Sequence, residues 1–86
     1  MLADHRPALA RSVRLHHDKV RDTDLLLMPE RAVRLTGAGG TILRLCDGRR
    51  TTAEIVAELV RDFPGEPVEA ETTAFLDRMR EQGWLI

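Results

Sequence analysis

Residues 25–35 read Leu-Leu-Leu-Met-Pro-Glu-Arg-Ala-Val-Arg-Leu, and this stretch sets the architecture of the chain. Two runs suited to strands flank Pro29-Glu30, and a proline at this place favours a turn because its ring fixes φ. The stretch predicts a β-hairpin with strands at 25–28 and 31–35. Upstream, Val13 and Leu15 alternate with polar neighbours at the two-residue period of a strand. They predict a further antiparallel strand over 13–17.

Downstream of the hairpin, the apolar residues change to helical spacing. The first helix is expected to begin at Thr36, whose hydroxyl would cap free backbone N–H groups. It should run through Cys46 and end at Asp47-Gly48, because a glycine tolerates the left-handed conformation that often closes a helix.

Two longer amphipathic helices should follow. Thr51 and Glu54 have the spacing of a capping box and open a helix that Phe63-Pro64-Gly65 stops. The next helix is expected from 68 or 69 to 82, with Gly83 at its end. Its buried stripe is predicted to contain Thr72, Phe75, Leu76 and Met79. Three strands followed by three helices predict an α+β domain of the winged helix-turn-helix kind.

Length and composition limit the class of protein. With 86 residues and a mass of 9.7 kDa, the chain is expected to form a single domain over 1–86. Cys46 is the only cysteine, and the sequence has neither the pattern of a signal peptide nor a long apolar segment. We therefore expect a soluble protein of the reducing cytoplasm that does not associate with membranes.

The charge distribution argues against nucleic acid as the partner. The second predicted helix carries Arg61 against three carboxylates, and the third carries two arginines against four, so each has a net charge of −2. Affinity for DNA comes mainly from Lys and Arg side chains that neutralise phosphates. A winged-helix nucleic-acid binder therefore remains an alternative only, which affinity falling steeply with salt would identify.

The residue types that most often carry chemistry are poorly arranged for it. His16 and His17 are neighbours in a strand, so they point to opposite faces and do not readily hold one metal ion. Cys46 lies among leucines and is expected to be a small buried apolar residue. The run 37–40, Gly-Ala-Gly-Gly, lacks the Lys-Ser/Thr of a phosphate-binding loop and favours close packing or a flexible start of the helix. We expect no metal, no cofactor and no enzymatic activity.

An exposed sheet edge is the remaining candidate site. If the strand 31–35 lies at the margin of the sheet, its free N–H and C=O groups can accept a peptide as a fourth strand. The third helix would supply an apolar wall of Phe75, Leu76 and Met79. The basic side chains that would meet acidic peptide residues are Arg31, Arg34 and Arg78. If the N–H of Val33 faces the peptide, Val33→Pro should weaken binding. The other interpretation is that the edge is merely protected by its charges and that the helical stripe is entirely core.

Several segments also resemble a known family. Residues 6–9 with 13–15, 26–35 and 42–48 read Arg-Pro-Ala-Leu with Val-Arg-Leu, Leu-Leu-Met-Pro-Glu-Arg-Ala-Val-Arg-Leu and Ile-Leu-Arg-Leu-Cys-Asp-Gly. They resemble the PqqD family, the peptide chaperones of pyrroloquinoline quinone (PQQ) biosynthesis. The similarity extends through 51–56, 75–76 and 83–85, so it covers 6–86.

This resemblance implies a recognition domain for a ribosomally made precursor peptide, with no catalytic activity of its own. In the family, the precursor peptide PqqA docks between the third strand and the third helix. It is then presented to the radical S-adenosylmethionine enzyme PqqE, which cross-links Glu and Tyr side chains. On this chain, the resemblance implies a docking strand of Ala32, Val33, Arg34, Leu35 and Thr36 and a helix face of Phe75, Leu76, Arg78 and Met79. Together with Arg31 from the sheet-edge argument, these are the predicted peptide-binding residues. A recognition domain of another modified-peptide pathway is the alternative.

Three positions depart from the family pattern. Ser12 stands where the family usually has Gly, Thr36 where Asn is common, and Gly39-Gly40 where better helix formers are usual. Two glycines cost about 1 kcal/mol each relative to Ala inside a helix. The boundaries of the first helix are therefore open, and so is a homodimer formed by exchange of an element.

Overall fold

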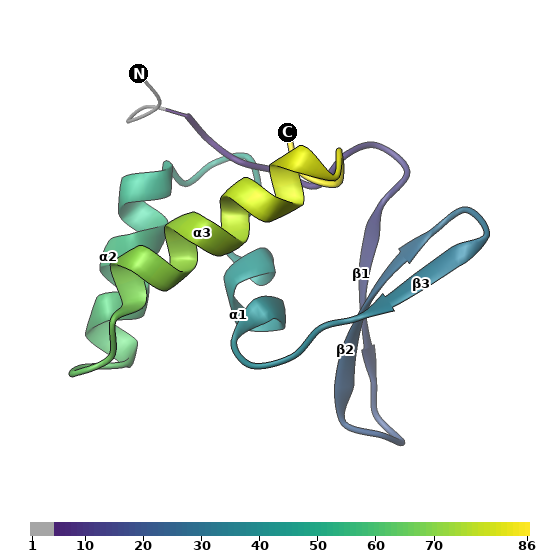
Figure 1. Ribbon diagram of the computed structural model, residues 1–86, viewed down its shortest axis with the longest axis horizontal. Helices are drawn as coiled ribbons and strands as arrows, with labels where there is room; N and C mark the ends of the chain where they lie inside the picture. The colour runs from purple at the N-terminus through teal and green to yellow at the C-terminus, as the bar shows by residue number, and fades with distance from the viewer. Residues whose placement is uncertain (1–4) are drawn as a thin grey trace.

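A computed structural model describes residues 5–86 (Figure 1). Three strands precede three helices, which confirms the predicted α+β architecture. The strands are β1 (Arg14–Asp18), β2 (Thr23–Met28) and β3 (Arg31–Arg34). The helices are α1 (Gly39–Arg44), α2 (Thr52–Asp62) and α3 (Val68–Glu81).

The sheet is antiparallel throughout, with β2 between β1 and β3. The predicted hairpin is confirmed, because Met28 pairs with Arg31 and only Pro29 and Glu30 lie between β2 and β3. Glu30 has φ of 63°, a left-handed conformation that lets two residues reverse the chain. Leu26 on β2 is completely buried and anchors the sheet to the core.

The two longer helices end as their sequences predicted. At the start of α2, the hydroxyl of Thr51 accepts a hydrogen bond from the N–H of Glu54, and the Glu54 carboxylate accepts one from the N–H of Thr51. This is the complete capping box. At the other end of the chain, Gly83 follows α3 with φ of 81°. Ile55, Leu59 and Leu76 fill the space between α2 and α3 and are nearly inaccessible.

The first helix is shorter than predicted at both ends. The chain stays extended past Arg34, since the N–H of Leu35 still donates to the carbonyl of Asp24 at 2.9 Å. Helix α1 therefore begins only at Gly39, and the predicted cap by the Thr36 hydroxyl is wrong, because the residue before the helix is Ala38 and no side chain caps it.

The predicted end of α1 at Asp47-Gly48 is also wrong. The helix stops at Arg44, and Asp47 forms a turn of its own in which its carboxylate accepts hydrogen bonds from the N–H groups of Arg49 and Arg50. Gly48, with φ of 78°, donates its N–H to the carbonyl of Pro7 at 3.0 Å. These two residues thus join the N-terminal segment to the helices.

The N-terminal segment also runs beside the C-terminal one. Ala8 and Ile86 exchange two backbone hydrogen bonds, 3.2 and 2.8 Å long, and Ala10 donates to the carbonyl of Trp84 at 2.9 Å. Figure 1 shows the described N-terminal segment beside the C-terminus, with α1 between the α2–α3 pair and the sheet.

Candidate functional site

Strand β3 is an edge strand, as the sequence predicted. Within residues 5–86 it pairs only with β2. Its side chains alternate, with Val33 and then Leu35 half-buried on the face that the helices cover, and Ala32 and Arg34 exposed on the other face. The strand therefore offers a free backbone edge next to a partly apolar surface.

One hydrogen bond fixes which backbone groups point out of this edge. Leu35 bonds through its N–H to Asp24, and this pair continues the register in which Arg34 and Val33 face successive residues of β2. Antiparallel pairs alternate between hydrogen-bonded and non-hydrogen-bonded positions. Val33 therefore directs its N–H and C=O toward β2, whereas Ala32 and Arg34 direct theirs outward.

This geometry corrects the choice of Val33→Pro as a probe. Val33→Pro would report on peptide binding only if the N–H of Val33 faced outward, and this N–H faces β2 instead. A proline at Val33 would remove a hydrogen bond between β2 and β3 and damage the sheet itself. The residues whose backbone reports on the free edge are Ala32 and Arg34.

Helix α3 contributes fewer exposed residues than its sequence pattern suggested. Leu76 and Met79 are only 1% and 9% exposed and belong to the core. Phe75 is half-buried, and its ring lies so close to Gly39 that a Cβ at that glycine would be 3.3 Å from it. The guanidinium of Arg78 lies 5.8 Å from the centroid of the same ring. The accessible part of the predicted helix face is thus Phe75 with Arg78.

A hollow of ≈ 300 Å³ lies between α3 and the chain that follows β3. It brings together three of the predicted residues, Thr36, Phe75 and Arg78. Its remaining lining residues were not among the sequence candidates, and they are Ala38, Gly39, Ile42, Glu71 and Ala74. The small residues of the Gly-Ala-Gly-Gly run were the available signal, because they admit the Phe75 ring where a larger side chain would clash. From here on we call this space the strand hollow.

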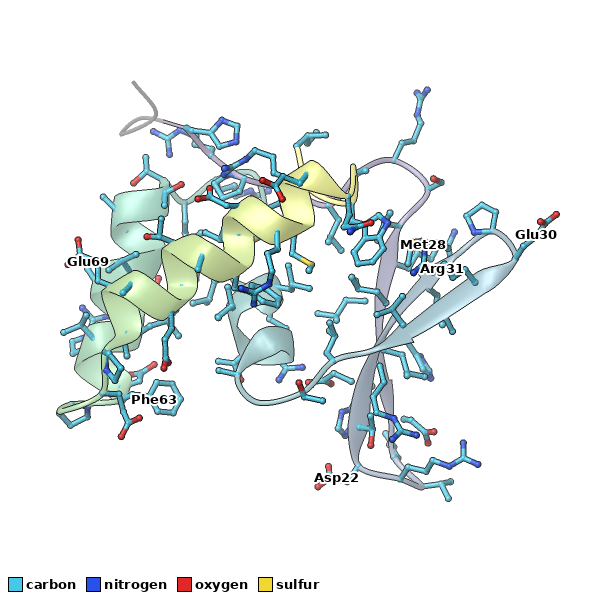
Figure 2. The ribbon with its side chains drawn as sticks, viewed as in Figure 1. Asp22, Met28, Glu30, Arg31, Phe63 and Glu69 are labelled. Atoms are coloured by element: carbon cyan, nitrogen blue, oxygen red, sulfur yellow. The ribbon has the colours of Figure 1, made fainter. Side chains whose placement is uncertain are left out.

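Arg31 lies at the opposite end of β3. Its guanidinium is 5.2 Å from the centroid of the Trp84 ring, a cation–π contact just beyond the C-terminus of α3. Figure 2 shows Arg31 beside Met28, away from the loop that carries Phe63. Trp84 therefore marks this end of the site, although the sequence pattern gave it no role beyond the end of the helix.

Asp24 links helix α1 to the sheet. Its carboxylate accepts hydrogen bonds from His17 Nδ1 at 2.8 Å and from Arg44 Nη1 at 3.3 Å. The bond from His17 is the main reason that the pKa of Asp24 lies below its ordinary value of 3.8, and Arg44 adds to the effect. Gly40 packs directly on this carboxylate. Because α1 lines the strand hollow, Asp24 is a positioning residue for it.

The other chemistry-bearing residues lie elsewhere. His16 is exposed on β1, and residues 5–86 contain no group of three or more His, Cys, Asp or Glu side chains placed to hold a metal ion. Cys46 is buried as predicted, its thiol donating weakly to the carbonyl of Ile42 at 3.5 Å. Burial raises the pKa of this thiol to about 11, so it is protonated at neutral pH.

The fold and the open edge beside α3 define a small winged-helix-like domain. Its sequence matches the family model described as coenzyme PQQ synthesis protein D (PqqD) over residues 25–85. The chain belongs to the PqqD family. A relative from Pseudomonas aeruginosa, named PqqA binding protein, is 40% identical over 83 residues, 95% of this chain and 90% of that protein. A protein of the same name from Gluconobacter oxydans is 39% identical over 80 residues, 91% and 83% of the two chains.

Two solved structures share the fold. The PqqD part of PqqCD from Methylobacterium extorquens, described as a functional and stand-alone recognition element for ribosomally synthesised and modified peptides, has a TM-score of 0.76 and 34% identity. The match covers 93% of this chain and 87% of that one. PqqD from Xanthomonas campestris has a TM-score of 0.57 and 29% identity, covering 96% and 94%. No helix within residues 5–86 combines the length and apolar character needed to cross a bilayer.

Proposed function

We propose that this chain binds the precursor peptide PqqA as an added strand on β3 and presents it to the radical S-adenosylmethionine enzyme PqqE in PQQ biosynthesis. Support comes from relatives named PqqA binding protein at 40% identity and from the likeness to a peptide recognition element. The peptide-binding residues would be those of β3 and of the strand hollow. Residues 1–86 would act as one recognition domain, and its cytoplasmic location stays a prediction.

The outward backbone groups of Ala32 and Arg34 are the observation that carries this proposal. A peptide strand laid along β3 forms backbone hydrogen bonds with the outward N–H and C=O groups of these two residues, which the sheet already holds in place. Alternate side chains of the peptide enter the strand hollow beside Phe75. Arg34 and Arg78, both exposed, favour acidic residues on the guest strand. The peptide therefore gains affinity from the backbone and specificity from the hollow.

The chain's own role would be binding without catalysis. A nucleophilic cysteine needs an accessible thiolate, whereas Cys46 is 5% exposed and its pKa is raised to about 11. We propose that the chemistry on the bound peptide belongs to PqqE, and that this chain holds the substrate segment in an extended form.

The test is a proline at Ala32, compared with a valine at the same place. Ala32→Pro removes an outward N–H and should weaken PqqA binding about tenfold or more, because a peptide carbonyl loses its donor. Ala32→Val keeps the N–H, suits a strand and should bind within about twofold of the unchanged chain. Calorimetry with synthetic PqqA measures both, and thermal unfolding checks that both variants are folded.

Equal affinities of the two variants would contradict strand addition on β3. With PqqE present, Ala32→Pro should also slow the appearance of cross-linked PqqA at limiting chaperone, while Ala32→Val should not. A normal rate with Ala32→Pro would remove the proposed presentation role.

A further inference from the structure

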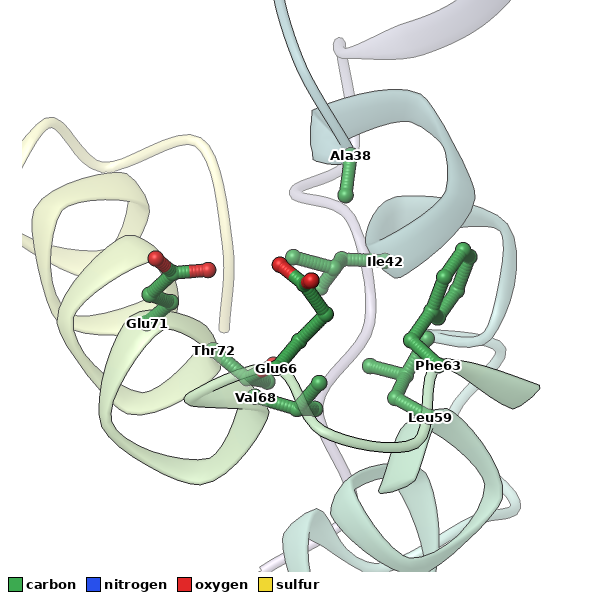
Figure 3. Close-up of a pocket in the computed structure, with 8 residues that line it drawn as sticks. All are labelled: Ala38, Ile42, Leu59, Phe63, Glu66, Val68, Glu71 and Thr72. Carbon is green, nitrogen blue, oxygen red and sulfur yellow. The ribbon is translucent and has the colours of Figure 1, made fainter. Parts of the chain in front are cut away.

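A second, smaller hollow opens where α1, α2 and the start of α3 meet (Figure 3). Its volume is ≈ 100 Å³, which is room for about three water molecules at roughly 30 Å³ each. Three of its lining residues, Ala38, Ile42 and Glu71, also line the strand hollow. The two spaces therefore adjoin each other, and together we call them the groove. We call the smaller part the anchor pocket.

The walls of the anchor pocket are largely apolar, and one apolar side chain in them is exposed to solvent. Ile42, Leu59 and Val68 are buried side chains that form its base. Phe63 lines it as well and is 41% exposed, one of only three aromatic residues in the chain. An aromatic ring left half in water beside an apolar hollow gains contact area when an apolar guest fills the hollow.

Two carboxylates stand at the mouth of the anchor pocket. Glu66 comes from the α2–α3 loop and Glu71 from the first turn of α3, and Figure 3 shows both among the apolar lining residues. Within residues 5–86, no Lys, Arg or His side chain forms an ion pair with either of them. Their negative charge is not compensated locally, so it favours a guest that brings a positive charge.

The groove as a whole is electrostatically polar. Arg78 is exposed beside the strand hollow, Glu71 lines both spaces, and Glu66 lines the anchor pocket alone. A guest lying along the entire groove meets a basic group first and acidic groups later. Opposite charges on the guest, in the matching order, are the complementary pattern.

We infer that the anchor pocket binds an apolar side chain of the precursor peptide, flanked in that peptide by a Lys or Arg. This inference rests on the proposed function and extends it, because it assigns a contact beyond the strand paired with β3. The guest is the same peptide, since the pocket shares its walls with the strand hollow. One aliphatic side chain fits its volume, and the neighbouring basic residue meets Glu66 and Glu71.

Methyl NMR on the unchanged chain tests the placement directly. On titration with synthetic PqqA, the methyl groups of Ile42, Leu59 and Val68 should shift, and they should saturate at the same peptide concentration as the amides of Ala32 and Arg34. Shifts confined to the β3 amides would overturn the anchor pocket and leave strand addition intact. Methyl shifts that appear only when PqqE is added would overturn it too, because the occupant would then be the enzyme.

Two matched pairs of variants measure the contribution of the pocket. Phe63→Ala should weaken PqqA binding about fivefold to thirtyfold, as truncation of an anchoring contact does. Its control is Val60→Ala, an exposed apolar residue of α2 outside the pocket lining, which should leave binding unchanged. Glu66→Lys should weaken binding about fivefold in low salt and less in high salt. Glu69→Lys makes the same change of charge outside the pocket lining and should have a smaller effect.

The results separate this inference from the proposed function. If Ala32→Pro weakens binding but Phe63→Ala binds as well as Val60→Ala, the anchor pocket is wrong and strand addition stands. If the unchanged chain does not bind PqqA, both are wrong. Thermal unfolding of each variant shows whether it is folded, and the methyl titration on the unchanged chain decides the placement regardless of that outcome.

Discussion

Gly40 in α1 is buried against Asp24, a residue of β2 that is distant in the sequence. A Cβ built at this position would overlap the carboxylate of Asp24 on β2 and would lie 2.8 Å from the Cβ of that residue. The carboxylate would have to leave its hydrogen bonds to His17 and Arg44 to make room. The sequence shows only that a glycine weakens a helix; the structure shows that this glycine lets the helix approach the sheet.

We predict that Gly40→Ala destabilises the protein despite the better helix propensity of alanine. Alanine gains up to about 1 kcal/mol in a helix, whereas forcing atoms into a packed site costs about 1–3 kcal/mol, so the free energy of unfolding should fall by about 1 kcal/mol. Urea unfolding followed by circular dichroism measures it. Gly39→Ala, whose Cβ comes no nearer than 3.3 Å to Phe75, should cost less. A stabilised Gly40→Ala would show that Asp24 moves aside freely.

The division of the α3 stripe also lies beyond the sequence. Helical spacing placed Phe75, Leu76 and Met79 together, but which of them is accessible depends on what packs against the helix. Leu76 is buried in the core, whereas Phe75 is only half-buried, because its ring packs against the small residue Gly39 and borders the strand hollow. The spacing of apolar residues identifies one face of a helix, whereas the elements that pack against this face determine which of its residues remain accessible to a ligand.

At the scale of elements, local signals predicted ends well where they were complete. The capping box of α2, the two-residue hairpin turn and Gly83 after α3 are each contained within a few residues, and each is confirmed. The ends of α1 depended instead on long-range contacts, namely the bond from Leu35 to Asp24 and the bond from Gly48 to Pro7. Six residues are too few for propensity to set the limits of a helix against such contacts.

Thr51→Ala tests the capping box. Loss of the hydroxyl leaves the N–H of Glu54 without its acceptor, so the free energy of unfolding should fall by about 1 kcal/mol. Thr51→Ser retains the oxygen and should lose much less. Thermal and urea unfolding of the two variants provide the comparison. If serine and alanine are equally destabilising, the methyl group of Thr51 matters more than its cap.

At the scale of the whole molecule, hydrogen-bonded carboxylates make the stability of the fold depend on pH. Hydrogen bonds hold the pKa of each of four carboxyls below its ordinary value: the N–H of Arg21 acts on Asp18, His17 on Asp24, the N–H of Arg49 on Asp47 and the N–H of Thr51 on Glu54. A lowered pKa in the folded state means that the unfolded chain binds protons first as the pH falls. Stability is therefore full above the ordinary values of 3.8 and 4.5 and is lost as the pH drops through the lower folded values.

Asp24→Asn should reveal how much one such carboxylate contributes to the stability of the fold. At pH 7 the variant should unfold at a lower temperature than the unchanged chain, because the charged hydrogen bonds to His17 and Arg44 are weakened. As the pH falls from the ordinary value of 3.8 through the lower folded pKa, Asp24 becomes protonated in the folded chain as well, and the gap between the two unfolding temperatures should narrow. Circular dichroism melts from pH 7 to pH 2.5 measure the gap. A constant gap would mean that the asparagine acts through packing alone.

The pairing of Ala8 with Ile86 has a consequence for how such a domain can be built into larger proteins. The polypeptide enters and leaves the fold at neighbouring points, and neither residue lines the strand hollow. Fusion partners and tethers can be spliced on at this one corner with little strain on the sheet or helices. An enzyme fused there would be tethered close to a peptide bound on β3, and the free edge of β3 would remain accessible.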